Sequence, residues 1–142
     1  MKKVVFLSAL CFSLLASSSF AAEAKKGLNV VLTAADAQTQ QMAMVLSLMT
    51  LKQGKQVNMT LCSKAGDLAV KGMKSEKLKP KGKSPKMMLQ AIMKNGAKVE
   101  VCPLYLPNAN KDKSVLLEGI NVAKPAKVAE QLLNSDFTTL SY

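Results

Sequence analysis

The sequence predicts an α/β domain in which helices cover both faces of a mainly parallel sheet of about five strands, a three-layer α/β/α sandwich. The first observation is a set of short apolar runs, such as residues 28–32 and 97–102, of the kind found in parallel strands buried on both faces. The second is that segments with helical periodicity and clear start and stop signals separate these runs. Such alternation is typical of α/β folds with right-handed crossovers.

The first strand and helix are predicted over residues 28–54. Residues 28–32 are almost all apolar, and Asp36 follows as a residue that can cap a helix. Four apolar residues then recur at helical spacing: Met42, Val45, Leu46 and Met49. We expect this stripe to face the core, with its methionines filling space rather than binding copper(I), and we expect Gly54 to end the helix.

The next segment combines a strand with a basic loop. Residues 57–62 alternate between apolar and polar and predict a second strand, and Ser63 can cap a short helix over residues 65–70. Residues 71–86 contain seven lysines and one glutamate, with glycines and prolines that break regular structure. We expect a mobile basic loop there.

Residues 84–142 predict two helices, two strands and one further short element. Ser84 and Pro85 are a cap and first-turn pair that starts a helix, which the Asn95–Gly96 turn ends before the strand over residues 97–102. Residues 115–117 begin a short helix or strand. A final helix starts at Pro125, and residues 137–142 form the last strand.

Residues 1–21 are predicted to be a secretory signal rather than part of the fold. Two lysines precede an apolar stretch over residues 4–15, and small residues, Ser19 and Ala21, occupy the two positions that a signal peptidase inspects. The stretch is shorter than the about 20 residues of a spanning helix, so we expect no stable membrane anchor. Residues 22–142 then form one exported domain, which is periplasmic in a double-membrane bacterium.

Composition restricts the partners of this domain. All 20 basic residues are lysines. The predicted signal contains two of them and none of the nine acidic residues, so the net charge of residues 22–142 is 18 minus 9, or +9. The absence of arginine and the scarcity of aromatic residues argue against a nucleic-acid partner. A lysine-rich surface instead attracts small anions, an acidic protein or anionic lipid.

Two cysteines carry the predicted chemistry, because the chain has no histidine. Its absence excludes Ser-His-Asp and Cys-His nucleophiles and the usual zinc and haem ligand sets, and no glycine-rich nucleotide loop is present, so we expect no metal and no cofactor. Cys11 leaves with the signal, which leaves Cys62 and Cys102. Cys102 ends a strand and precedes Pro103, at the strand end where α/β folds place reactive groups.

Residues 88–102 run from a helix through a glycine turn into a strand that ends in Cys102, and this stretch resembles the DsrE/DsrF-like (YchN-like) sulfur-relay family. Residues 117–122 and 136–142 also match the pattern of the family. The resemblance implies a flavodoxin-like α/β/α sandwich, a homo-oligomer (trimer or hexamer) and a persulfide-carrying cysteine, which falls on Cys102. The chain would be an exported member of a family with many cytoplasmic relatives.

The resulting hypothesis is a sulfur carrier or sulfurtransferase-type protein. The Cys102 thiolate would accept sulfane sulfur from small sulfur anions and pass it to a partner protein thiol. Cys62 is the second candidate, because it also ends a strand and precedes a helix start, which can favour a thiolate. Packing as a small apolar residue is the alternative for both cysteines. Two other functions remain open, a non-catalytic module that binds a small anion or a protein and a redox protein that uses both thiols.

The surroundings of the thiol are predicted in less detail. Four lysines of the basic loop are the candidates for binding anions: Lys79, Lys81, Lys83 and Lys86. An ordinary solvated loop is the alternative. Pro103, Tyr105 and Pro107 would form a wall beside Cys102, with Asn108 and Asn110 as neutral donors, unless Tyr105 contacts another subunit.

A disulfide between Cys62 and Cys102 is a separate question, which depends on strand order. In the common order, residues 28–32 lie in the centre of the sheet, and the two strands that end in cysteine flank them about 9 to 10 Å apart. A disulfide needs Cα atoms within about 7 Å, so this order disfavours the bridge unless the loops bend inward.

Overall fold

The computed structural model describes residues 24–142 and forms a parallel five-stranded sheet between two layers of helices. The predicted signal over residues 1–21 lies outside the described residues and stays a prediction. In chain order the elements are β1 (Gly27–Leu32), α1 (Ala37–Lys52), β2 (Gln56–Leu61), the 3₁₀ helix η1 (Ser63–Ala69), α2 (Pro85–Lys94), β3 (Lys98–Val101), α3 (Tyr105–Asn108), the 3₁₀ helix η2 (Lys113–Val115), β4 (Asn121–Val122), α4 (Pro125–Leu133) and β5 (Phe137–Ser141).

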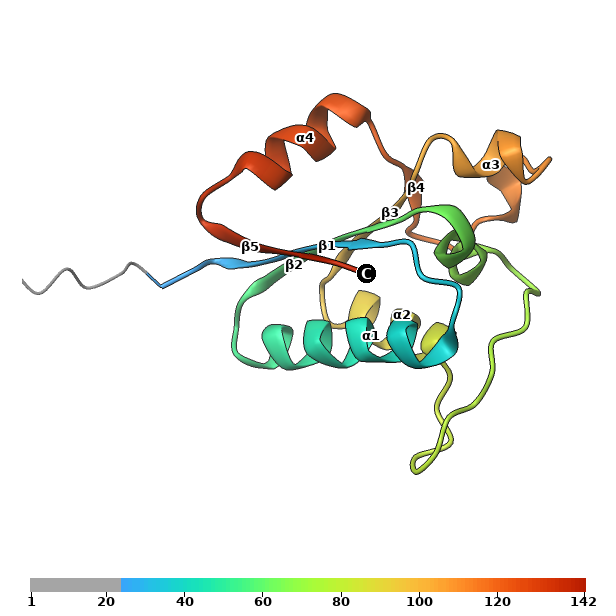
Figure 1. Cartoon of the computed structure of the whole chain (residues 1–142), viewed down its shortest axis with the longest axis horizontal. Helices are drawn as coiled ribbons and strands as arrows, with labels where there is room; N and C mark the ends of the chain where they lie inside the picture. The colour runs from blue at the N-terminus through green and yellow to red at the C-terminus, as the bar shows by residue number, and fades with distance from the viewer. Residues whose placement is uncertain (1–23) are drawn as a thin grey trace, which may run out of the picture.

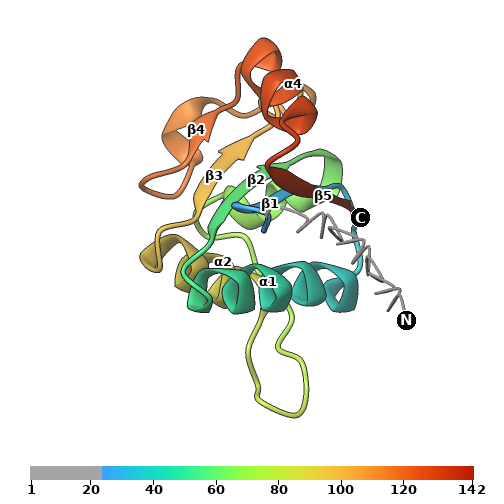
Figure 2. The ribbon, with the colours of Figure 1, turned by 90° about the vertical axis from the view of Figure 1, so that its left-hand side faces the viewer.

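The layers confirm the predicted fold class. Helices α1 and α2 cover one face of the sheet, and α4 lies across the other (Figure 1). Each pair of neighbouring strands is parallel, in the order β4-β3-β2-β1-β5 (Figure 2). All five strands therefore end at the same edge of the sheet, where η1 and α3 lie.

The observed strand order differs from the one expected. Strand β1 lies between β2 and β5, and β2 lies between β1 and β3. The strands that lead into Cys62 and Cys102 are therefore neighbours, and the expected separation by a central strand is wrong. Two crossovers in the same direction, β1 to β2 and β2 to β3, give this order. Nothing in the local sequence pattern distinguishes it from an order in which the direction reverses after the first crossover.

Helix α1 buries a different face from the one predicted. Its buried residues are Gln40, Ala43, Met44 and Ser47. Met42 and Met49 are 52% and 41% exposed, so the expectation that they fill the core is wrong. The Gln40 amide donates to the Ala34 carbonyl at 2.8 Å and the Ser47 hydroxyl donates to the Ala43 carbonyl at 2.8 Å, which gives each of these two buried side chains a hydrogen-bond partner.

The predicted helix starts at Asp36 and Ser84 agree with the structure, but the expected Ser63 cap is wrong, because Cys62 occupies the N-cap position of η1 and no side chain caps it. Asp36 accepts a hydrogen bond from the Thr39 amide at 2.8 Å, and Ser84 accepts one from the Met87 amide at 3.2 Å, with Pro85 in the first turn. Residues 70–84, between η1 and α2, contain two isolated bridges but no helix or longer strand. The short strand β4 was not predicted from the sequence.

The core lies mainly between the sheet and the α1–α2 layer. Its largest fully buried side chains include Leu32, Met44, Met59, Leu61 and Leu89. Helix α4 has no buried residue and is tied to the sheet through Asn29, whose amide donates to the Gln131 carbonyl. Within residues 24–142 we find no helix with the length and apolar character needed to cross a membrane.

Candidate functional site

Two thiols lie next to each other at the carboxyl edge of the sheet. Leu61 in β2 and Val101 in β3 are Cα partners at the end of the ladder, and Cys62 and Cys102 are the residues that follow them. The Cys102 amide donates to the Leu61 carbonyl at 2.8 Å, which extends the strand pairing up to this cysteine. Both cysteines are half-buried and free.

The chain turns sharply after each cysteine. Ser63 adopts a left-handed backbone with φ 51°, which is uncommon for a residue with a side chain, and starts η1 directly after Cys62. On the other strand, Pro103 cannot continue the ladder. The Tyr105 amide donates to the Cys102 carbonyl at 3.0 Å at the start of α3. The two turns place η1 and α3 around a space above the thiols.

This space is a pocket of about 470 Å³ into which both cysteines face. Its other lining residues come from η1 and from the α3 segment: Ser63, Lys64, Asp67, Leu104, Tyr105, Asn108 and Ala109. The volume lies within the roughly 300 to 1,000 Å³ of small-molecule sites. The position at the carboxyl ends of parallel strands is also the usual ligand site of open α/β sheets.

Tyr105 forms one wall of the pocket. Its hydroxyl donates to Asp67 Oδ1 at 2.6 Å and joins α3 to η1. Burial, together with the hydrogen bond and charge of Asp67, raises the pKa of Tyr105 far above its ordinary value. Gly66 lies under the ring, where a Cβ atom would come within 2.3 Å of Tyr105 Cδ2. The phenol is therefore a fixed neutral donor in this wall.

The two thiols affect each other electrostatically. Burial, followed by the hydrogen bond with Cys102 and the charge of Cys102, together raise the pKa of Cys62 to about 11. The expectation that the helix start beyond Cys62 favours a thiolate there is therefore wrong, because burial and the second sulfur outweigh it. Cys62 keeps its proton at neutral pH and serves as a donor to its neighbour.

The loop lysines and the thiols lie at different places. The one lysine that lines the pocket is Lys64, whereas Lys79 lies with residues of α1 in a separate depression. Lys81 and Lys83 are exposed in the same loop, which extends away on the α1–α2 side of the sheet (Figures 1 and 2). A role of these lysines in binding anions stays a prediction, and Lys64 is the cation that the fold places beside the thiols.

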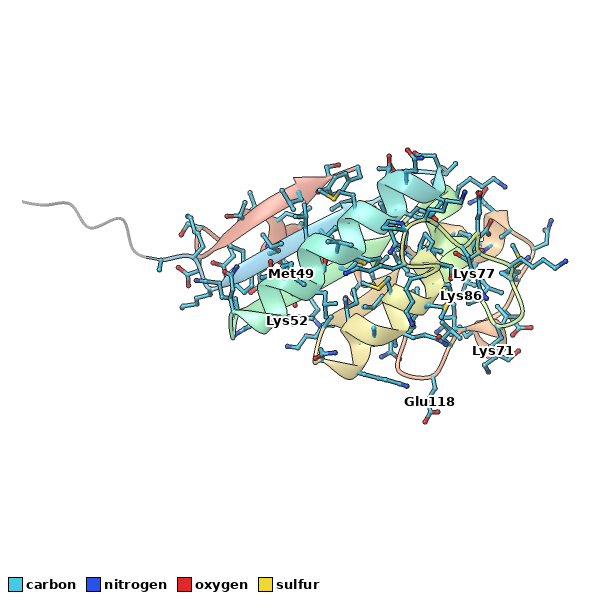
Figure 3. All side chains as sticks on the ribbon, turned by 90° about the horizontal axis from the view of Figure 1, so that it is seen from below. Met49, Lys52, Lys71, Lys77, Lys86 and Glu118 are labelled. Carbon is cyan, nitrogen blue, oxygen red and sulfur yellow. The ribbon has the colours of Figure 1, made fainter. Side chains whose placement is uncertain are left out.

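Lys86 differs from the other three candidates. Its ammonium donates to the Val70 carbonyl and to the Met73 carbonyl, the latter at 3.0 Å, and fastens the start of the loop to α2. Burial lowers its pKa, and the charge of Asp67 partly offsets this shift. In Figure 3, which views the molecule from the side that α1 and α2 cover, Lys86 is labelled together with Lys71 and Lys77. Its contacts indicate a structural role.

Sequence reasoning found both cysteines, Tyr105 and Asn108 but missed Lys64 and Asp67. The position of these two residues in the sequence could have identified them. Both follow Cys62 within five residues and lie on the helix that starts where the strand ends. Across residues 24–142 there is no cluster of three or more histidine, cysteine or acidic side chains that could hold a metal ion.

The comparisons with known proteins concern the fold. No family model matches the chain, and no curated protein matches it in sequence. The solved structure of the YchN protein from E. coli is similar, with a TM-score of 0.68 and 16% identity over 83% of this chain and 99% of that one. A protein of unknown function from Methanobacterium thermoautotrophicum, MTH1491, matches with a TM-score of 0.57 and 11% identity over 82% and 97% of the two chains. The chain therefore has the DsrE-like α/β fold of these two proteins.

Proposed function

We propose that the protein is an exported sulfur carrier that holds sulfane sulfur as a persulfide on Cys102. The observation that carries this proposal is the position of Cys102, a free thiol in an open pocket at the carboxyl edge of a DsrE-like sheet. A sulfur carrier needs a cysteine that small sulfur donors and a partner thiol can both reach. A fully buried thiol could not react with either of them, whereas Cys102 is half-buried and lines an open pocket.

The chemistry of loading requires only groups found in the pocket and the donor. The Cys102 thiolate attacks the outer sulfur of thiosulfate, the S–S bond of the donor breaks, and sulfite leaves with the bonding electrons. With a polysulfide the same attack releases a polysulfide one sulfur shorter. Lys64, at the rim, offers a positive charge to these anions. Transfer to a partner thiol then returns Cys102 to its reduced form.

Mass spectrometry tests the proposal directly. The reduced protein is exposed to thiosulfate or polysulfide, and a persulfide adds about 32 Da on the peptide that contains Cys102. The matched control is Cys102→Ser, which keeps the size of the side chain but should give no adduct. A protein that stays unmodified under conditions that persulfidate a free thiol standard would exclude the carrier role.

Export, association and partners belong to the same proposal. We propose a periplasmic homo-oligomer, trimer or hexamer, that receives sulfur from small anions and passes it to a protein thiol. Exposed apolar side chains support association, among them Met42 and Met49 on α1 and Leu133, 85% exposed, at the end of α4. Light scattering of the mature chain measures the subunit number, and N-terminal sequencing of protein from the host locates the cleavage site.

A further inference from the structure

The pairing of β2 with β3 aligns the backbone of the two cysteines at a spacing that permits a disulfide. Cys62 and Cys102 occupy the next aligned position after the Leu61–Val101 partners. Neighbouring strands lie about 4.8 Å apart, and disulfides join Cα atoms about 4.4 to 6.8 Å apart. The obstacle expected from the other strand order, a separation of about 9 to 10 Å, is therefore absent.

The side chains also point the same way. Both cysteines line the same pocket, and the hydrogen bond and charge of Cys102 contribute to the raised pKa of Cys62. The charged and titratable groups that face the pair are Lys64 and Asp67 from η1 and Tyr105 from α3. The Asp67 carboxylate already accepts the Tyr105 hydrogen bond, whereas the two thiols interact with each other through a hydrogen bond.

We propose that Cys62 is the resolving thiol for a persulfide on Cys102, so that sulfur not passed to a partner leaves the protein as hydrosulfide. This inference rests on the proposed carrier function. It adds a second fate for the sulfur bound to Cys102, which is release as hydrosulfide instead of transfer to a partner thiol. The Cys62 sulfur attacks the inner sulfur of the persulfide, which is the Sγ atom of Cys102. The Cys62–Cys102 disulfide forms, the bond to the outer sulfur breaks, and the departing sulfur keeps the bonding electrons.

The step balances without an external oxidant. The outer sulfur is reduced to sulfide, the two cysteine sulfurs are oxidised to a disulfide, and the proton of the Cys62 thiol leaves with the sulfide as hydrosulfide. The raised pKa of Cys62 is consistent with this order of events, because a protonated thiol attacks slowly and leaves time for a partner thiol to take the sulfur first. A dithiol or two monothiols then restore the reduced pair.

The experiment follows the mass of the protein and the sulfide released after a pulse of polysulfide. The purified protein is reduced, freed of reductant, loaded briefly and then sampled over time without added thiol. For the wild type we expect an adduct of about 32 Da that decays to a species about 2 Da lighter than the reduced protein, with one hydrosulfide released per disulfide. For Cys62→Ser we expect an adduct at least about tenfold longer-lived and no matching release.

The outcomes separate this inference from the carrier function. An adduct on Cys102 that decays equally fast in the wild type and in Cys62→Ser would overturn the resolving role and leave the carrier function standing. No adduct in either protein would overturn both. A further measurement does not depend on loading, because oxidised glutathione should close the pair directly in the wild type. Failure to form the intramolecular disulfide under those conditions would refute the proposed geometry.

Discussion

Gly66 and Tyr105 fix the shape of the pocket above the thiols, and Gly66→Ala is the sharpest test of that packing. A Cβ atom at residue 66 would lie 2.3, 2.5 and 2.6 Å from three atoms of the Tyr105 ring. Normal contacts between carbon atoms are about 3.5 to 4.0 Å, so the ring would have to move by more than about 1 Å. This movement would pull the hydroxyl away from Asp67, with which it now makes a hydrogen bond of 2.6 Å.

Two costs add in this variant. Overpacking of a buried site costs about 1 to 3 kcal/mol, and a weakened hydrogen bond to a charged group costs up to about 1.5 to 3 kcal/mol. Because the ring can shift partly and keep part of the hydrogen bond, we expect Gly66→Ala to lower the free energy of unfolding by about 2 to 4 kcal/mol. For a domain of this size that corresponds to a fall in Tm of about 10 °C.

Chemical denaturation of four proteins measures the coupling. These are the wild type, Gly66→Ala, Tyr105→Ala and the double variant, in which the added methyl group meets no ring. We expect a coupling free energy of at least about 2 kcal/mol. Gly54→Ala is the matched control, because a Cβ atom there has nothing within 4 Å and the cost comes from its φ of +72° alone, about 1 to 2 kcal/mol. Additive effects, or a cost below about 0.5 kcal/mol for Gly66→Ala, would refute the packing argument.

Three further predictions test the site and its support. At low salt, Lys64→Gln should slow the labelling of Cys102 by anionic iodoacetate more than the labelling by neutral iodoacetamide. Lys81→Gln should change neither rate. Equal effects of the two substitutions would argue against a local role of Lys64. Because the folded-state pKa of Cys62 is raised from 9.0 to about 11, the protonated thiol stabilises the fold below pH 9 and this contribution is lost as the pH rises through 11. The free energy of unfolding of the wild type, measured by denaturation at several pH values, should therefore fall relative to that of Cys62→Ser between pH 9 and 11. If the two proteins showed the same dependence on pH, the raised pKa of Cys62 would be contradicted. Asn29→Ala should cost about 1 to 3 kcal/mol in thermal unfolding, because it removes the donor to the part-buried Gln131 carbonyl and the acceptor of the Asn58 amide. A neutral result would contradict the role of Asn29 in holding α4 to the sheet.

Local sequence signals were sufficient for the longer helices and strands and for the edge of the sheet at which the cysteines lie. The Asp36 and Ser84 caps, and the apolar runs of β1 and β3, are determined by interactions within a few residues. The buried face of α1 is not determined in this way, because the helix is apolar on more than one side and the deciding contacts come from α2 and the sheet. Gln40 and Ser47 enter the core only because nearby backbone carbonyls accept their hydrogen bonds.

Strand order is the property on which the chemistry depends most and the one that local patterns predict least. Each cysteine is predicted at the end of a strand in the expected strand order and in the observed one. Both orders also present the same apolar strand residues to the covering helices. Only the order β4-β3-β2-β1-β5 aligns Cys62 with Cys102 across one pair of strands and turns two separate candidates into one dithiol. If the pair closes on a persulfide, the strand order determines whether sulfur stays on the protein, because an isolated Cys102 would hold it until a partner thiol arrived.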